Sequence, residues 1–303
     1  MKPTFSVVIC THNPRIDYLQ RVLKALQNQS LSKDRWELLL IDNASDTILA
    51  DEIDLQWHPL SRHIREEKLG LTHARLRGIE EAVGEVSIFV DDDNVLESNF
   101  LEINRQIDRD WSVLGAWGGQ IIPEFEQTPP EWIKPYLMFL ALREFERDAW
   151  SNAGEMNESV PFGAGLCVRQ AVAQKYAEKV KQDDKRAILG RKGSLMTSCE
   201  DIDLALTACD LGWGTGQFKS LKLTHLISAN RIRENYLLQI VKGTSYSGIL
   251  MNAIRGKQAP PQPCFSQKLF QSYVRWRMKP IERRFYDARR EGINLALKEI
   301  ASW

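Results

Sequence analysis

The first 95 residues alternate between two apolar patterns, and this alternation limits the fold more than any other feature of the chain. Apolar or β-rich runs typical of strands occupy Phe5–Cys10, Trp36–Ile41, His63–Glu66 and Val86–Val90, of which the third is the weakest. Apolar residues at helical spacing fill Arg15–Gln29 and Leu71–Val83. Buried strands separated by helices form parallel sheets with right-handed crossovers. The pattern therefore predicts an α/β fold with a mostly parallel sheet between helices.

The rest of the chain is less regular. Strand-like segments at Val113–Ile122 and Phe218–Ile227 enclose a predicted helix at Ser198–Leu211, and the charged segment Lys179–Lys192 predicts an exposed loop. From Ile232 onward the spacing is helical. We therefore expect a main unit over residues 1–228, in the halves 1–95 and 96–228, and a helical extension over 229–303.

Polar clusters follow three of the predicted strands. They are Thr11-His12-Asn13, Asp42-Asn43 and Asp91-Asp92-Asp93. Sheets of this kind bind ligands beyond the carboxyl ends of their strands. The sequence therefore predicts one binding site where the three clusters meet.

The acidic cluster favours a divalent cation. In an extended chain Asp91 and Asp93 point to the same side, where two carboxylates repel each other without a counter-charge. Mg²⁺ or Mn²⁺ takes oxygen ligands and completes its shell with phosphates and water. The alternative is an acidic turn that caps the helix near Ser98.

Two further residues each have a functional and a structural interpretation. Asp42 could accept hydrogen bonds from a base or a ribose, or could close a turn with Asn43 and Ser45. The guanidinium of Arg75 suits pyrophosphate oxygens, but it could also lie on a solvated helix face.

Carboxylates recur at Glu200-Asp201, where a helix begins. Ser198 and Asp201 have the spacing of a capping box, and on these residues alone capping is the better interpretation. The functional interpretation is a general base for an incoming hydroxyl. His225 could bind a metal or a phosphate, although a lone histidine is more often a half-buried structural residue.

Overall composition excludes several classes of protein. Lys plus Arg and Asp plus Glu number 40 each, which argues against bulk electrostatic binding of nucleic acid. Five cysteines without a C-x-x-C pair are typical of reduced thiols in the cytoplasm. No apolar run reaches the roughly 18 residues that a spanning helix needs. We expect a cytoplasmic protein with at most peripheral membrane contact.

Together the segments resemble the family 2 glycosyltransferases, which have the A-type, Rossmann-like nucleotide-sugar fold. The resemblance runs from about Phe5 to Arg231 and rests on the order of its motifs. These are Cys10-Thr11-His12-Asn13, Asp42-Asn43-Ala44-Ser45, Lys68-Leu69-Gly70, Ala74-Arg75-Leu76-Arg77-Gly78, Asp91-Asp92-Asp93, Glu200-Asp201 before Gly212-Trp213, and His225 with Arg231. Cys10, Lys68 and Leu76 replace the family's Pro, Asn and Asn, and none of these changes removes a charged group.

The resemblance implies inverting transfer of a sugar from a nucleotide-diphosphate sugar, a UDP-sugar by default, to a hydroxyl of a saccharide or lipid-linked saccharide. It implies Asp201 and Glu200 as catalytic carboxylates, and Mn²⁺ or Mg²⁺ held by Asp91, Asp93 and His225. The implied donor contacts are Thr11, Asn13, Asp42, Arg75, Asp91, Asp92, Gly163 and Arg231. It also implies that residues 1–95 bind the nucleotide and that residues 96–228 bind the acceptor. Processive members carry Q-x-x-R-W, which Gln271–Trp276 lacks, so we expect transfer of a single sugar.

The C-terminal segment Gln267–Ala296 is basic and interleaved with aromatic residues. Such a helix can lie on an anionic membrane surface. The alternative is a helical lid or a contact in a homodimer, and the sequence slightly favours this alternative.

Three other functions remain as alternatives. A catalytically inactive sugar-nucleotide-binding or scaffold protein would not need both Asp91-Asp92-Asp93 and Glu200-Asp201. A nucleotidyltransferase usually has a glycine-rich loop with a basic residue after its first strand, and an oxidoreductase would need G-x-G-x-x-G there. Thr11-His12-Asn13-Pro14 matches neither.

Overall fold

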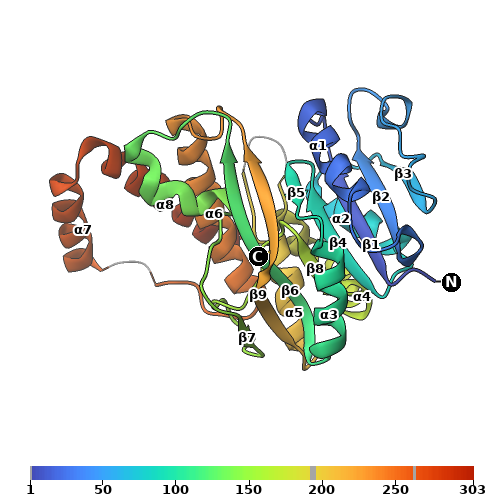
Figure 1. Ribbon diagram of the computed structural model, residues 1–303. Coiled ribbons are helices and arrows are strands. Elements are labelled where there is room, and N and C mark those ends of the chain that lie inside the picture. The colour runs from blue at the N-terminus through green and yellow to red at the C-terminus, as the bar shows by residue number, and fades with distance from the viewer. Residues whose placement is uncertain (1, 192–195, 262–263) are drawn as a thin grey trace.

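The computed structural model describes residues 2–191, 196–261 and 264–303, and its first part has the predicted alternation (Figure 1). The elements there are β1 (Phe5–Thr11), α1 (Ile16–Gln27), β2 (Trp36–Asn43), β3 (Ser61–Glu66), α2 (Leu71–Glu81) and β4 (Val86–Asp91). The next are β5 (Asn94–Leu96), α3 (Phe100–Asp110), β6 (Leu114–Phe125), β7 (Ala149–Ser151), β8 (Leu166–Arg169), α4 (Gln170–Gln182), α5 (Glu200–Asp210) and β9 (Gly214–Ile227). The C-terminal helices are α6 (Glu234–Ile254), α7 (Phe265–Arg277) and α8 (Pro280–Ile300). The main 3-10 segments are η3 (Glu131–Leu140) and η4 (Asp184–Leu189).

Nine strands of the described residues form one mixed sheet. The order is β3-β2-β1-β4-β8-β6-β9-β5, and β7 also pairs with β9. The first four strands are parallel, as are β6 and β9, whereas β8 runs antiparallel between β4 and β6. The predicted α/β fold with a mostly parallel sheet is confirmed.

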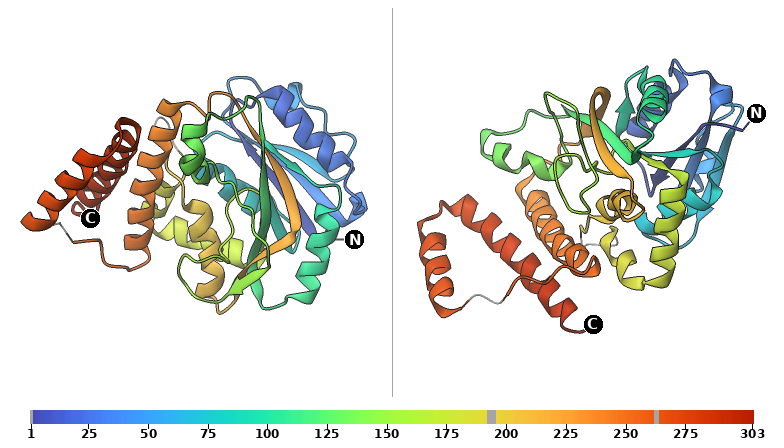
Figure 2. Two further views of the ribbon diagram at one scale, coloured as in Figure 1. Left: turned by 60° about the vertical axis from the view of Figure 1, so that its left-hand side comes forward. Right: turned by 90° about the horizontal axis from the view of Figure 1, so that it is seen from below.

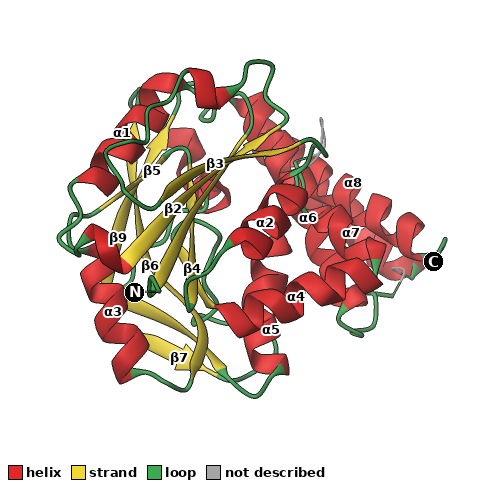
Figure 3. Ribbon diagram, turned by 90° about the vertical axis from the view of Figure 1, so that its right-hand side faces the viewer, coloured by secondary structure: helices red, strands yellow, loops and turns green. Residues whose placement is uncertain are grey.

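Helices cover both faces of the sheet, because successive strand residues point to opposite sides. Val7 and Ile9 of β1 pack in the core beneath α1 and α3, while Val8 packs in the core beneath α2, α4 and α5. Figure 3 shows these two helical layers on either side of the strands. Burial on both faces explains why the first strands read as continuous apolar runs.

The register of the sheet brings the polar clusters together at one edge. Thr11 of β1 lies opposite Asp42 of β2, and Cys10 lies opposite Asp91 of β4. The expected meeting of the strand ends is therefore confirmed.

The helical C-terminal region packs around α6. Gly292 of α8 lies against the backbone of α6, where a Cβ would come within 2.2 Å of the Lys242 carbonyl oxygen. About two turns earlier on the same face of α8, the ring of Phe285 stacks on Tyr136 of η3, with centroids 3.5 Å apart. Figure 2 shows α7 at the outer edge of this region. Within the described ranges, every helix is too short or too polar to cross a bilayer.

The predicted exposed loop at 179–192 is wrong for most of its length. Helix α4 continues to Gln182 and is followed by η4, and Val180 and Leu189 are buried. These two apolar side chains pack into the protein. The many charged residues around them in the sequence led to the prediction of an exposed loop. Lys192 lies outside the described residues.

Candidate active site

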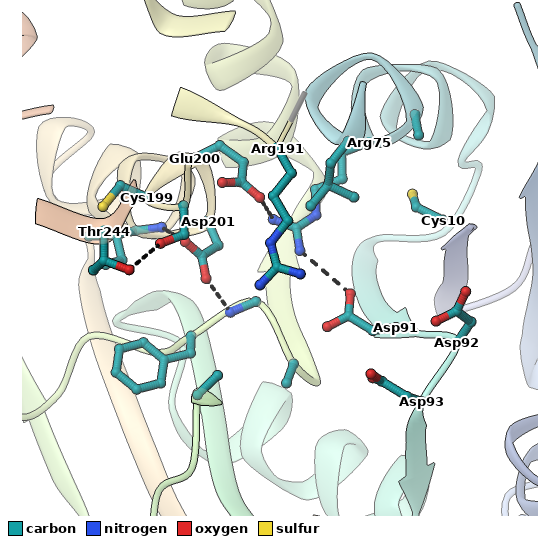
Figure 4. Close-up of a pocket in the computed structure, with 18 of the residues that line it drawn as sticks. Cys10, Arg75, Asp91, Asp92, Asp93, Arg191, Cys199, Glu200, Asp201 and Thr244 are labelled. Carbon is teal, nitrogen blue, oxygen red and sulfur yellow. Dashed lines mark hydrogen bonds and ion pairs between the residues drawn. The ribbon is translucent and has the colours of Figure 1, made fainter. Parts of the chain in front are cut away.

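A cavity of about 670 Å³ lies at the carboxyl ends of β1 and β4. Its wall includes residues of β1, α2, β4, α5, β9 and α6, with Thr11 and Arg75 among them. Figure 4 shows the acidic residues that follow β4 across the cavity from the start of α5. The described residues thus bring ten of the predicted site residues to one space. They are Thr11, Arg75, Asp91, Asp92, Asp93, Gly163, Glu200, Asp201, His225 and Arg231.

The three acids of the cluster have different partners. The carboxylate of Asp92 accepts a short hydrogen bond from the Thr11 hydroxyl. Asp93 Oδ2 lies 2.5 Å from Arg231 Nη1 and 3.3 Å from His225 Nε2. The side chain of Asp91 is 38% exposed, and its Oδ1 makes only a long contact of 3.8 Å with Arg75 Nη2. The carboxylate of Asp91 is therefore the one most open to the cavity.

The three carboxyl groups are so close that ionisation of one disfavours ionisation of the others. Burial and the neighbouring Asp93 raise the pKa of Asp92 to about 7, against the opposing effect of its hydrogen bond from Thr11. Burial also disfavours ionisation of Asp93, but His225 and Arg231 outweigh it and hold the pKa of Asp93 below its usual value. The cluster is a place where additional positive charge is favourable.

Two donor atoms at this end of the cavity are close enough to share a divalent cation, but both contact the Arg231 guanidinium in this structure. Asp93 Oδ2 and His225 Nε2 are separated by 3.3 Å, a spacing at which two ligands can share one ion with bonds of about 2.1 Å. His225 Nδ1 is buried and lacks a hydrogen-bond partner among the described residues. No three His, Cys, Asp or Glu side chains of the described ranges are gathered as a complete ligand set. An ion here would need further ligands from water or substrate.

The other wall is formed where α5 begins. Arg75 of α2 donates to Glu200 Oε1 at 2.9 Å, and both side chains are only 5% exposed. Burial opposes the charge of Arg75, but Glu200 and Asp91 reverse that effect and raise the pKa of the guanidinium. Glu200 is thus the buried counter-charge of Arg75.

Asp201 is turned toward the loop before β8. Its Oδ2 accepts a hydrogen bond of 2.6 Å from the backbone N–H of Gly163. A Cβ at Gly163 would lie 2.6 Å from Arg75 Nη2 and 3.0 Å from Asp201 Oδ2, so a larger residue here would push one of these side chains aside. Gly163 therefore holds the positions of both side chains.

The predicted capping box at Ser198 is wrong. Helix α5 starts at Glu200 with Cys199 as its N-cap, and the Cys199 side chain makes no capping bond. Asp201 is therefore the second helical residue instead of the third, which a capping box requires. Its Oδ1 accepts a hydrogen bond of 2.8 Å from the N–H of Ile202, and the carboxylate lines the cavity.

Two predicted donor contacts lie beside the cavity wall instead of on it. Asp42 accepts from the Ser45 N–H at 3.0 Å and from Arg65 Nη1 at 2.7 Å, which confirms the turn. The Asn13 side chain donates to Asp46 Oδ2 at 3.0 Å. The roles of Asn13 and Asp42 in donor binding stay predictions.

The sequence analysis gave no individual role to Asn43 or Arg191, two polar residues of the cavity wall. Asn43 lines the wall, and its Oδ1 accepts from the N–H of Gly70 at 2.8 Å, where the chain turns into α2 with φ 139°. Arg191 also lines the wall and points inward in Figure 4, and it helps to lower the pKa of Asp93. The role at this strand end was given to the charged neighbour Asp42. Arg191 lies in a segment with many charged residues, and its sequence position does not distinguish it from the others.

Comparison with known proteins places these observations in a family. The family model for glycosyl transferase family 2 matches residues 6–159. N-acetylgalactosaminyltransferase 7 of Drosophila melanogaster is 35% identical over 104 residues, which are 33% of this chain and 18% of that protein. Glycosyltransferase AglE of Haloferax volcanii is 30% identical over 103 residues, which are 33% of this chain and 34% of AglE. The chain thus spans only a small part of these relatives.

Among solved structures, the chain is similar to S. aureus TarS. Residues 1–349 of TarS superpose with a TM-score of 0.54 at 14% identity, covering 98% of this chain and 83% of that one. The same TarS fragment in complex with UDP gives a TM-score of 0.52 at 15% identity, again covering 98% and 83%. At this identity the likeness concerns the fold, and it includes the helical C-terminal region.

Proposed function

The chain belongs to glycosyl transferase family 2, and we propose that it is an inverting enzyme that moves one sugar from a nucleotide-diphosphate sugar to an acceptor hydroxyl. The observation that carries the proposal is the placement of Asp201 across one cavity from the acidic cluster Asp91–Asp93 (Figure 4). A donor and an acceptor bound in this cavity would have a general base on one side and a diphosphate-binding cluster on the other. The proposed acceptor is a saccharide or a lipid-linked saccharide.

We take a UDP-sugar as the first donor to test. Support comes from the crystal structures of TarS, which were obtained in complex with UDP and with UDP-GlcNAc. In this chain Thr11, Arg75 and Arg191 line the cavity next to the acidic cluster. Guanidinium groups bind diphosphate oxygens through paired hydrogen bonds. The nucleotide is therefore proposed to lie over the ends of β1 and β4.

We further propose that Mn²⁺ or Mg²⁺ is held by Asp93 and His225, and that Asp91 moves in as a third ligand when the ion binds. When bound, the ion supplies positive charge to the diphosphate that leaves. Arg231 Nη1 lies 2.5 Å from Asp93 Oδ2 and 2.9 Å from His225 Nε2, so its guanidinium would have to turn aside for the ion to bind these two atoms. Arg75, anchored by Glu200, adds a second positive charge to the same end.

Asp201 is proposed to be the general base. Its carboxylate accepts the proton of the acceptor hydroxyl while the hydroxyl oxygen bonds to the anomeric carbon. The bond from that carbon to the phosphate oxygen breaks on the other side, and its electron pair leaves with the nucleotide diphosphate. The N–H of Gly163 fixes the direction of the Asp201 carboxylate. Glu200 is engaged with Arg75, so we assign it a positioning role.

The test combines a donor screen with an isosteric variant. Release of nucleotide diphosphate is measured with UDP-, GDP- and dTDP-sugars and a panel of acceptors. Asp201→Asn should reduce transfer by about 10²- to 10⁴-fold, because a general base contributes about that much, while UDP binding is retained. Asp110→Asn, at an exposed carboxylate ending α3, is the matched control and should be unchanged. Turnover of Asp201→Asn at the wild-type rate would remove Asp201 from the proposed role.

A further inference from the structure

Helix α7 turns its polar side toward the protein. It packs along α8, where Arg275 Nη2 lies 2.6 Å from Asp287 Oδ2 and Gln271 accepts a short hydrogen bond from Arg290. No side chain of α7 is fully buried. Figures 1 and 2 show α7 at the periphery of the molecule. The contacts that hold α7 on α8 are thus largely ionic and polar.

The outward side of α7 is apolar. Phe265, Leu269, Tyr273 and Trp276 are 77%, 57%, 53% and 73% exposed, respectively. Their spacing of four, four and three residues places them on one face of the helix, which we call the aromatic face. A surface helix normally turns such a face toward the core. A contiguous exposed apolar patch of this kind marks an interaction site.

The segment that carries the aromatic face has an excess of positive charge. Residues 264–290 contain eight Lys or Arg and two Asp or Glu, although the whole chain has equal numbers of each. Lys268 and Arg277, one near each end of α7, are both exposed. The partner must therefore offer an apolar phase next to negative charge.

We propose that the aromatic face of α7 lies in the interfacial region of a bilayer that contains anionic lipids. Trp and Tyr are favoured at that depth because one part of each ring system is apolar and another part is polar. Basic side chains at the rim are attracted by the anionic headgroups. A second copy of the chain fits less well, because a two-fold contact would place the basic rims of both copies against each other. The proposal concerns a surface remote from the cavity and does not depend on the proposed reaction.

Vesicle flotation of the full chain tests this proposal. The protein should float with phosphatidylcholine vesicles that contain phosphatidylglycerol and stay behind with pure phosphatidylcholine, and added salt should weaken the binding. Phe265→Ser combined with Leu269→Ser and Trp276→Ser should lower partitioning at least about tenfold, because these side chains no longer leave water on binding. Lys268→Gln combined with Arg277→Gln should lower it by about fivefold for each charge removed.

Two control variants remove equivalent groups elsewhere. Trp150→Ser on β7 and Arg109→Gln on α3 remove a comparably exposed aromatic ring and a comparably exposed positive charge, and should leave flotation unchanged. Circular dichroism should be the same for all variants, because α7 has no buried side chain to lose. Absence of flotation with anionic vesicles at low salt would overturn the proposal. So would a wild-type dimer in sedimentation that the aromatic-face variant converts to monomers while vesicle binding is unaffected.

Discussion

The ion pair between Arg75 and Glu200 provides the sharpest test of how the site is built. Substitution of Arg75 by Met keeps most of the apolar stem and leaves the Glu200 carboxylate without its partner at 2.9 Å. Both side chains are 5% exposed, so water replaces the lost interaction only in part. Removing one member of such a buried pair lowers the free energy of unfolding by about 3–5 kcal/mol. Asp91 also loses a neighbour, but its 3.8 Å contact and greater exposure limit that contribution to below about 1 kcal/mol.

Protonation of Glu200 sets the pH dependence of this loss. Burial raises the pKa of Glu200, and Arg75 opposes the rise, so Arg75→Met should raise this pKa further. The folded variant then binds a proton that the unfolded chain releases. Its stability should be highest below the ordinary glutamate pKa and should fall as pH rises through the raised pKa. The loss caused by Arg75→Met is therefore expected to be larger at about pH 8 than at about pH 6.

Urea unfolding, followed by tryptophan fluorescence, measures the effect in a double-mutant cycle with Glu200→Gln. In the Glu200→Gln background, Arg75→Met should cost only about 1 kcal/mol, because a neutral amide loses a single hydrogen-bond partner. Arg77→Met is the matched control on the same helix. Its 2.8 Å pair with Glu81 is partly exposed and should contribute below about 0.5 kcal/mol. If Arg75→Met costs no more than Arg77→Met, or costs the same in both backgrounds, then Arg75 does not hold the Glu200 charge.

Two further outcomes are expected at the cavity. Asp93→Ala should lose the Mn²⁺-dependent part of UDP binding, measured by calorimetry with and without the ion, and an undiminished metal effect would contradict the assignment of Asp93. Gly163→Ala should lower transfer and also lower stability by about 1–3 kcal/mol, because its Cβ would lie 2.6 Å from Arg75 Nη2 and must displace Arg75 or Asp201. Wild-type kinetics in Gly163→Ala would mean that neither side chain depends on the close backbone.

Most of the first half of the fold could be predicted from the sequence because each pattern there has a single physical cause. Strands buried on both faces appear as continuous apolar runs, and α1 and α2 show helical spacing. The position of β8 could not be predicted in the same way. It has four residues, and nothing in Leu166–Arg169 records that it runs antiparallel between β4 and β6. Strand order depends on tertiary packing, which a local pattern does not contain.

Site residues were predictable where charge and strand position agreed, as at Asp91 and Asp93. Asp42 met both criteria, yet its carboxylate is used by Ser45 and Arg65. The neighbouring Asn43 reaches the cavity wall and fixes the turn into α2. A difference of one residue at the end of a strand decides which side chain faces the ligand space, and the sequence pattern does not resolve it.

The charges of the cavity suggest why nucleotide and metal should bind together. Among the described residues, the wall carries the carboxylates of Asp91, Asp92, Asp93, Glu200 and Asp201 and the guanidinium groups of Arg75, Arg191 and Arg231. Burial raises the pKa of Asp92 and of Glu200 to about 7, so both are partly protonated near neutral pH and the acids and guanidinium groups are close to balance. A nucleotide diphosphate adds further negative charge, so its binding without a cation should be weak. By linkage, an ion that strengthens UDP binding by a given factor must itself bind more tightly by the same factor when UDP is present. Titrations in both orders should therefore return equal coupling, and unequal values would mean that the ion and the nucleotide do not share this cavity.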